Sequence, residues 1–139
     1  MRDGRYSYRF EGYAMEKGQT HTIVGVGSIK IANMKVIRGD HRASLARMTG
    51  SGSTLIHSHF SLAGSARFVA VEQSWDVELV FEELTAPANR GAQTVNGSFR
   101  AVEAGPDRYW IISTGAISTM NGVQDEANEV VSGELVWLG

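Results

Sequence analysis

The chain has 139 residues, of which 20% are charged, a formal net charge of −2 and no cysteine. This length predicts one domain, residues 1–139, that is long enough to bury a core. The absence of cysteine excludes disulfides, zinc–thiolate sites and thiol catalysis. The weak net charge gives no electrostatic reason to expect nucleic acid or an anionic membrane as a partner.

The N-terminal residues 1–5 lack the apolar core of a signal peptide. No stretch of the chain reaches the roughly 18 apolar residues that a spanning helix needs. We therefore expect a cytoplasmic protein with no membrane partner.

Alternation of apolar and polar residues, which is typical of half-buried strands, recurs along the chain. It predicts strands at 6–15, 20–31, 35–38, 54–72, 75–84, 93–104, 108–117 and 129–138, where 54–72 is either one bent strand or two short ones. Turns are predicted at 16–19, 32–34 and 105–107, and loops at 49–53, 85–91 and 119–127. Residues 41–48 fit either a continued edge strand or a short helical turn.

The strongest of these patterns lies at 75–84. Its apolar residues, Trp75, Val77, Leu79 and Phe81, alternate with Asp76, Glu78 and Glu82. We expect the first set to face a core and the second to face water, because a one-residue slip would bury three carboxylates. The acidic pairs Glu82-Glu83 and Asp125-Glu126 are interpreted as solvated faces.

A short motif occurs three times, as Gly27-Ser28-Ile29-Lys30, Gly64-Ser65-Ala66-Arg67 and Gly97-Ser98-Phe99-Arg100. On a strand the glycine and the third residue share the apolar face, while the serine and the cation share the polar face. Seven glycines fall on apolar faces: Gly12, Gly25, Gly27, Gly64, Gly97, Gly115 and Gly133. They either permit the sharp coiling of a small barrel or also leave part of its interior unfilled.

Together these patterns predict an all-β fold, a single antiparallel, mainly up-and-down barrel of about eight strands. Closure of such a sheet removes its edges. The strand pattern and Gly4-Arg5-Tyr6, which opens the first strand, resemble the calycins, the lipocalin-like and avidin-like barrels, and the similar barrel of allene oxide cyclases. Many calycins have Gly-x-Trp at this point, and here tyrosine stands in place of tryptophan.

The sequence His57-Ser58-His59 places two histidines on one face of a strand, a spacing at which they could share a metal ion. The phase of Phe60 and Leu62 instead turns Ser58 inward and both histidines outward. We therefore predict no metal site, and no cofactor is expected.

Nine residues in the inward phase are predicted to line a ligand site in the lumen: Tyr8, Phe10, His21, Ser58, Phe60, Glu72, Trp75, Phe99 and Tyr109. A mostly aromatic pocket with a few hydroxyls and one or two ionisable groups is typical of small-ligand sites. Buried tyrosine and tryptophan also serve structural roles when their polar tips reach a loop or water. Glu72 would be a general acid or base if it enters an apolar mouth, or solvated if it lies at a turn.

The leading hypothesis is a barrel that binds a small apolar or aromatic molecule in its lumen. An alternative is an enzyme of cyclase, isomerase or lyase type, in which a tyrosine, His21 or Glu72 moves a proton on a hydrophobic substrate in the same lumen. A third hypothesis is an oligomerising structural module with a packed interior, and the sequence leaves homo-oligomerisation open. No catalytic residue is assigned.

Overall fold

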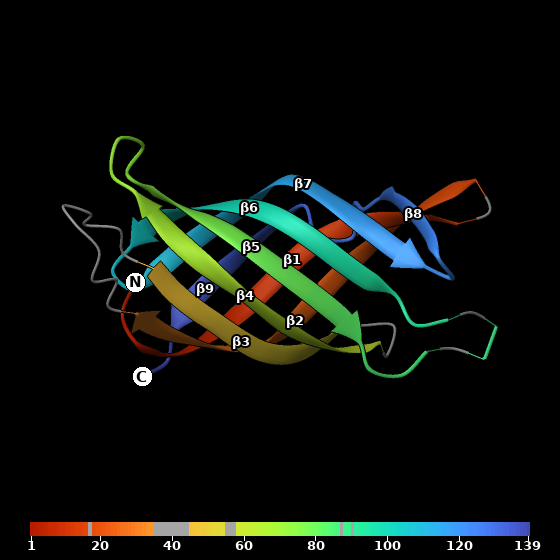
Figure 1. Ribbon diagram of the computed structural model, residues 1–139, viewed down its shortest axis with the longest axis horizontal. Helices are drawn as coiled ribbons and strands as arrows, with labels where there is room; N and C mark the ends of the chain where they lie inside the picture. The colour runs from red at the N-terminus through yellow and green to blue at the C-terminus, as the bar shows by residue number, and fades with distance from the viewer. Residues whose placement is uncertain (17, 35–44, 55–57, 87, 90) are drawn as a thin grey trace.

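The computed structural model describes residues 1–16, 18–34, 45–54, 58–86, 88–89 and 91–139. Within these residues the structure contains nine strands and no helix (Figure 1). The strands are β1 (Gly4–Glu16), β2 (Gln19–Met34), β3 (Leu45–Thr54), β4 (His59–Val69), β5 (Ser74–Glu83), β6 (Thr94–Gly105), β7 (Arg108–Met120), β8 (Val123–Glu126) and β9 (Ser132–Trp137).

Eight of these strands form a closed antiparallel barrel. The sheet order is β6-β5-β4-β3-β2-β1-β9-β7-β8, and a further pairing of β6 with β7 joins the two sides of the sheet. Strand β8 is an extra strand that pairs with the C-terminal part of β7, while β9 pairs with its N-terminal part. The predicted all-β, up-and-down barrel is confirmed.

The two ends of the barrel differ in what they carry (Figure 1). Both termini and the β6–β7 turn lie at one end, which we call the terminal end. The β1–β2 hairpin and the β5–β6 connection lie at the other end, which we call the cavity end. The half of the lumen next to each end is called the terminal half or the cavity half.

Alternation along the strands builds the core. The largest fully buried side chains are Tyr6, Ile29, Ile31, Met48, Val77 and Leu135. On β5 the four predicted inward residues are buried, Glu78 and Glu82 are exposed, and Asp76 is half-buried. The predicted orientation of this strand is confirmed, and it follows from the cost of burying carboxylates.

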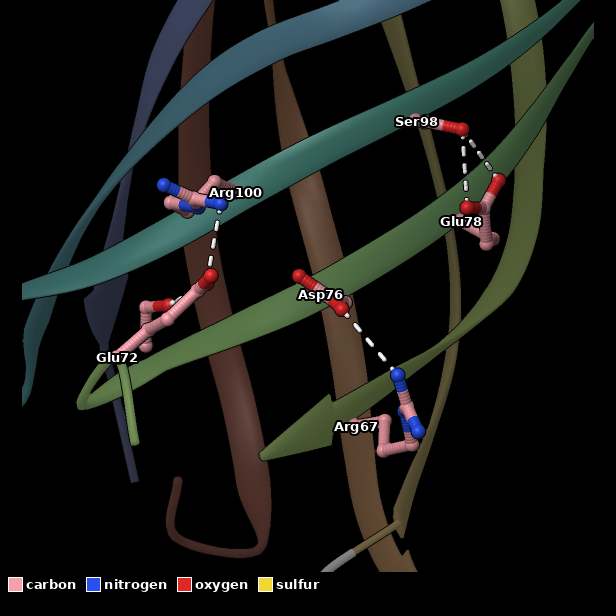
Figure 2. A network of polar contacts seen from close by, with 7 residues as sticks. Arg67, Glu72, Asp76, Glu78, Ser98 and Arg100 are labelled. Carbon is pink, nitrogen blue, oxygen red and sulfur yellow. Dashed lines mark hydrogen bonds and ion pairs between the residues drawn. The ribbon is translucent and has the colours of Figure 1, made fainter. Parts of the chain in front are cut away.

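The repeated Gly-Ser motif flanks β5 on both sides. Ser65 of β4 and Ser98 of β6 both pair with Glu78. Arg67 and Arg100, from the same two strands, both pair with Asp76. Figure 2 shows the resulting contacts on the outer face. Ser98 Oγ donates to Glu78 at 2.8 Å, Arg67 Nη2 lies 3.4 Å from Asp76 Oδ2, and Arg100 Nη2 lies 3.0 Å from Glu72 Oε2.

Two predicted loops are strands in the structure. Residues 49–53 belong to β3, which pairs with β2 and β4 along this stretch. Gly52 is needed there because a Cβ would overlap the Tyr8 hydroxyl and lie 2.5 Å from the Val26 carbonyl oxygen. Residues 119–127 contain the β7–β8 hairpin, whose turn residues Asn121 and Gly122 have φ of 53° and 76°. This Asn-Gly pair is a strong hairpin signal that the loop prediction overlooked.

The predicted turn at 32–34 is wrong, because these residues continue β2 and pair with the start of β3. Other predictions of secondary structure are confirmed or fall outside the described residues. The turn at 105–107 joins β6 to β7, and the described part of 85–91 contains no strand. The predicted strand at 35–38 and residues 41–44 lie outside the described residues. Residues 45–48 form the start of β3, so strand rather than helical turn is correct for them.

Candidate ligand-binding cavity

A cavity of about 110 Å³ opens at the cavity end of the barrel. Its buried lining is entirely apolar and consists of Phe10, Phe60, Phe81, Val95 and Val130. Its half-buried lining is mostly polar and consists of Ile23, Thr54, Ser58, Glu83, Gln93 and Glu129. The cavity therefore has an apolar floor toward the lumen and a polar rim toward solvent.

Three phenylalanines from three strands form the floor. Phe10 of β1, Phe60 of β4 and Phe81 of β5 have ring centroids 5.6 to 5.9 Å apart. The rings are inclined to each other by 56° to 65°. Such tilted and edge-on arrangements are favourable for aromatic pairs and bring packing energy beyond area burial. Strand alternation turns each ring inward, so the floor follows directly from the sequence pattern.

A hydrogen-bond network organises the rim. Ser58 Oγ donates to Glu83 Oε2 at 2.7 Å, and the backbone N–H of Gln93 donates to Glu83 Oε1 at 3.2 Å. The side-chain amide of Gln93 donates to Ser118 Oγ at 2.7 Å and to Glu129 Oε1 at 2.9 Å. Gln93 thus connects the two carboxylates of the rim.

Glu129 lies in the segment 127–131, which separates β8 from β9. This segment bonds to β1 on one side, through Tyr13 N–H to Asn128 O at 2.8 Å and Val131 N–H to Glu11 O at 2.8 Å. It bonds to β7 on the other side, through Ala127 N–H to Ala116 O at 2.9 Å. A Cβ at Gly12 would overlap the backbone carbonyl of Glu129, so only glycine allows this close approach.

One carboxylate oxygen of the rim has no hydrogen-bond partner among the described residues. Glu129 Oε2 is buried and accepts no hydrogen bond from the residues that the structure describes. A buried polar atom without a partner costs about 1–3 kcal/mol, more when it is charged. Because Glu129 lines the cavity, this oxygen is the acceptor nearest to hand for a donor that a ligand brings.

The middle of the lumen is nearly filled. A second cavity of about 30 Å³ lies there, lined in part by Tyr8, Phe10, Phe81 and Phe99. The hydroxyl of Tyr8 is buried with no partner among the described residues, and burial raises the pKa of this phenol. The central lumen therefore offers little room beyond its own side chains.

At most of the inward glycines, a neighbouring group occupies the position that a side chain would take. A Cβ at Gly25 would overlap the Phe10 ring, and one at Gly97 would lie 2.6 Å from the Phe99 ring. A Cβ at Gly64 would overlap the Glu78 carbonyl oxygen. Close approach thus accounts for these glycines. Gly115, predicted inward, is exposed, because a β-bulge shifts the β6–β7 register beside it.

The nine predicted site residues fall into four groups. Phe10, Ser58 and Phe60 line the main cavity, and Tyr8 and Phe99 line the smaller one. Trp75 and Tyr109 lie elsewhere, around a depression near Met1 at the terminal end.

The other two predicted site residues, His21 and Glu72, are exposed. His21 lies on the β1–β2 hairpin beyond Gly25, where the pairing of β2 with β3 ends, so its predicted inward orientation is corrected. Glu72 lies in the turn between β4 and β5 and contacts Arg100 on the outer surface. Its interpretation as a turn residue is confirmed.

Sequence reasoning missed four polar residues of the rim: Thr54, Glu83, Gln93 and Glu129. Glu83 continues the inward phase of Trp75 to Phe81, so alternation carried a signal, but the Glu82-Glu83 pair was assigned to a solvated face. The structure corrects this for Glu83, which is half-buried. Gln93 and Glu129 are the first residues of the predicted strands 93–104 and 129–138, and they share the inward phase of Val95 and Leu135, but neither was named as a site residue. In the structure both lie just before a strand, β6 or β9.

Other kinds of site were also considered. His59 is exposed, as its phase predicts, and His57 lies outside the described residues. Among the residues that the structure describes, no three histidine, aspartate or glutamate side chains gather as metal ligands would. Within the same residues, no helix has the length and apolar character to cross a membrane.

Comparisons with protein-family models, with curated proteins and with solved structures each returned no match. The fold that the chain adopts is a closed eight-stranded antiparallel β-barrel with one extra strand. Its buried aromatic cluster and the cavity above that cluster are the features from which a function has to be argued.

Proposed function

We propose that the protein binds a small molecule whose apolar part enters the cavity at the cavity end. The observation that carries this proposal is the combination of a phenylalanine floor with a polar rim at one end of a closed barrel. Small-ligand sites are concave and mostly apolar, with a few polar groups that orient the ligand. Eight-stranded up-and-down barrels of the calycin kind are known hosts for one small ligand in this position.

The cavity volume limits the size of the apolar part. An engineered apolar cavity of about 150 Å³ accepts benzene, so the cavity here, of about 110 Å³, suits a short alkyl chain or a small ring. A long lipid would require displacement of Tyr8, Phe10 and Phe81, which fill the centre. The presence of the cavity also favours binding over a purely structural module with a packed interior.

In the enzymatic alternative, the candidates for proton transfer are different from those predicted from the sequence. His21 and Glu72 are exposed and line neither lumen cavity. The carboxylates that reach the cavity are Glu83 and Glu129, and these are the groups that would move a proton if a reaction occurs there.

Binding of benzyl alcohol, a neutral probe of suitable size, tests the proposal by nitrogen–proton chemical-shift changes or by calorimetry. We expect saturable binding to the parent protein with shifts concentrated at the cavity end. Val95→Phe fills the cavity and should abolish binding. The matched control Val102→Phe, on the exposed face of the same strand, should leave it unchanged.

A second variant that blocks the cavity keeps the test decisive if Val95→Phe does not fold. Ile23→Phe adds bulk at the half-buried rim, where strain on the core is small. No binding to the parent protein, or binding to folded Val95→Phe and Ile23→Phe as strong as to the parent, would overturn the proposal.

A further inference from the structure

We propose that the ligand of this cavity carries a protonated amine that donates a hydrogen bond to Glu129. This inference rests on the proposed function and names the chemical class of its ligand. The observation behind it is the orphaned carboxylate oxygen, Glu129 Oε2, in a residue that lines the cavity.

The side-chain amide of Gln93 cannot donate a further hydrogen bond to Glu129 Oε2, because both of its N–H groups are already used. A primary amide has two N–H donors. The amide of Gln93 directs these to Ser118 Oγ at 2.7 Å and to Glu129 Oε1 at 2.9 Å. The amide thereby orients the carboxylate and leaves Oε2 without a donor from the described residues.

The carboxylate is also held in place by its backbone. The segment 127–131 bonds to both β1 and β7, and Gly12 lies directly against the Glu129 carbonyl. Because the backbone cannot retreat on either side, Glu129 presents an acceptor fixed before a ligand arrives. Preorganised acceptors bind with less loss of conformational entropy than mobile ones.

The carboxylate of Glu129 favours a cationic donor over a neutral or anionic one. The ionisable side chains among its described lining are Glu83 and Glu129, and both are acidic. Glu83 already accepts hydrogen bonds from Ser58 and from the backbone of Gln93. A charge-assisted hydrogen bond to a carboxylate is roughly twice as strong as a neutral one. An ammonium group beside the phenylalanine floor would supply both a hydrogen-bond donor for Glu129 Oε2 and a positive charge to balance the carboxylate.

Three probes with the same ring separate this inference from the proposed function. Benzylamine is protonated at neutral pH, benzyl alcohol is neutral, and benzoate is an anion. We expect the parent protein to bind benzylamine at least about tenfold more tightly than benzyl alcohol, and benzoate most weakly of the three. Calorimetry at one salt concentration measures all three.

Glu129→Gln keeps the shape of the side chain and removes its charge. It should lower the affinity for benzylamine to about that for benzyl alcohol and leave benzyl alcohol within about twofold of its original affinity. Glu126→Gln, an exposed carboxylate three residues away that does not line the cavity, is the matched control and should retain the preference for benzylamine.

The outcomes distinguish the two proposals. If benzyl alcohol and benzylamine bind equally well to the parent protein, or benzoate binds best, the amine inference fails while the binding function stands. If none of the three binds, the proposed function itself fails. If Glu129→Gln does not fold, the order of the three probes on the parent protein decides the inference alone.

Discussion

The two halves of the barrel share one hydrogen-bonded frame but pack differently. Toward the terminal end, Tyr6, Ile29 and Ile31 are at most 2% exposed. Toward the cavity end, Phe10, Phe60 and Phe81 are 6 to 8% exposed and surround a cavity of about 110 Å³. Strand β1 supplies Tyr6 to one half and Phe10 to the other, so the same strand serves both. The packing around Tyr6 is thus tighter than the packing around Phe10, where a cavity remains.

Two connections that border the cavity half carry part of the cavity's lining. At the terminal end, β4–β5 and β6–β7 are joined by short turns with left-handed residues, Gln73 at φ 53° and Asp107 at φ 58°. The cavity half is instead bordered by the longer β5–β6 connection and the irregular segment 127–131. Irregular chain carries side chains such as Gln93 and Glu129 to positions that strands do not reach.

The largest expected effect compares two isoleucines of β2. Ile31 is fully buried in the terminal half, and Ile23 is half-buried at the cavity. Ile31→Ala should lower the free energy of unfolding by about 3–5 kcal/mol, since it leaves a void in a filled core. Ile23→Ala should cost only about 1 kcal/mol, because part of its surface has no packing contacts to lose. Urea denaturation measures both, and equal losses would contradict the division into two halves.

Gly12→Ala tests the attachment of the segment 127–131 to β1. The added methyl group must displace the Glu129 backbone, which should cost about 1–3 kcal/mol of stability. It should also weaken ligand binding, because Glu129 and Val130 would shift. The matched control is Gly115→Ala, where an added Cβ meets no atom within 4 Å, and a loss there equal to that at Gly12 would refute the explanation.

Two tyrosines on one face of β1 should respond to the same substitution with opposite signs. The Tyr6 hydroxyl donates to the Arg2 carbonyl at 2.8 Å, so Tyr6→Phe should destabilise the protein by about 1 kcal/mol. The Tyr8 hydroxyl is buried without a described partner, so Tyr8→Phe should stabilise it by about 1 kcal/mol. Thermal or urea unfolding of both variants decides, and a loss of stability in Tyr8→Phe would show that its hydroxyl has a donor or acceptor.

Alkaline pH should reduce the stability that Tyr6→Phe loses relative to the parent protein. Burial raises the pKa of Tyr6 to about 12, from an ordinary value of 10. Between these values the unfolded chain releases the phenolic proton and the folded protein retains it, so stability is full below pH 10 and falls as the pH rises toward 12. The free energy of unfolding of Tyr6→Phe, measured over this range, should fall less steeply than that of the parent protein. Identical slopes would contradict the raised pKa.

The smallest effect is expected on the outer face. Arg67 and Asp76 form an ion pair of 3.4 Å whose side chains are 63% and 44% exposed. Asp76→Asn should change stability by less than about 0.5 kcal/mol, because exposed ion pairs are screened by solvent. A loss of more than about 1 kcal/mol in the free energy of unfolding, measured by urea denaturation, would show that this surface network stabilises the barrel.

The parts of the fold that the sequence predicted are those governed by alternation. Trp75, Val77, Leu79 and Phe81 were oriented correctly because burial of their neighbours' carboxylates is too costly. Residues 49–53 were predicted as a loop because glycine and serine are typical of loops, whereas the structure uses Gly52 to admit the Tyr8 hydroxyl. That requirement arises from a distant strand, and local composition does not reveal it.

The same distinction applies to the cavity. Phe10, Ser58 and Phe60 were predicted because each lies in the inward phase of a strand. Gln93 and Glu129 also share the inward phase of their predicted strands, but alternation does not show that the two side chains meet, because their contact depends on how segment 127–131 attaches to β1 and β7. His21 was misplaced because alternation gives the face of a strand but not the point at which the barrel ends.

The pairing of β1 with β9 has a consequence for how the barrel assembles. It joins residues 6–11 to residues 132–137, so the ring closes through contacts between strands about as far apart in the chain as any. Topologies dominated by such distant contacts fold slowly, on millisecond to second timescales. Until β9 docks, β1 and the N-terminal part of β7 have unpaired edges that invite association with other chains. Slow docking of β9 would therefore lengthen the time for which a newly made chain is exposed to aggregation.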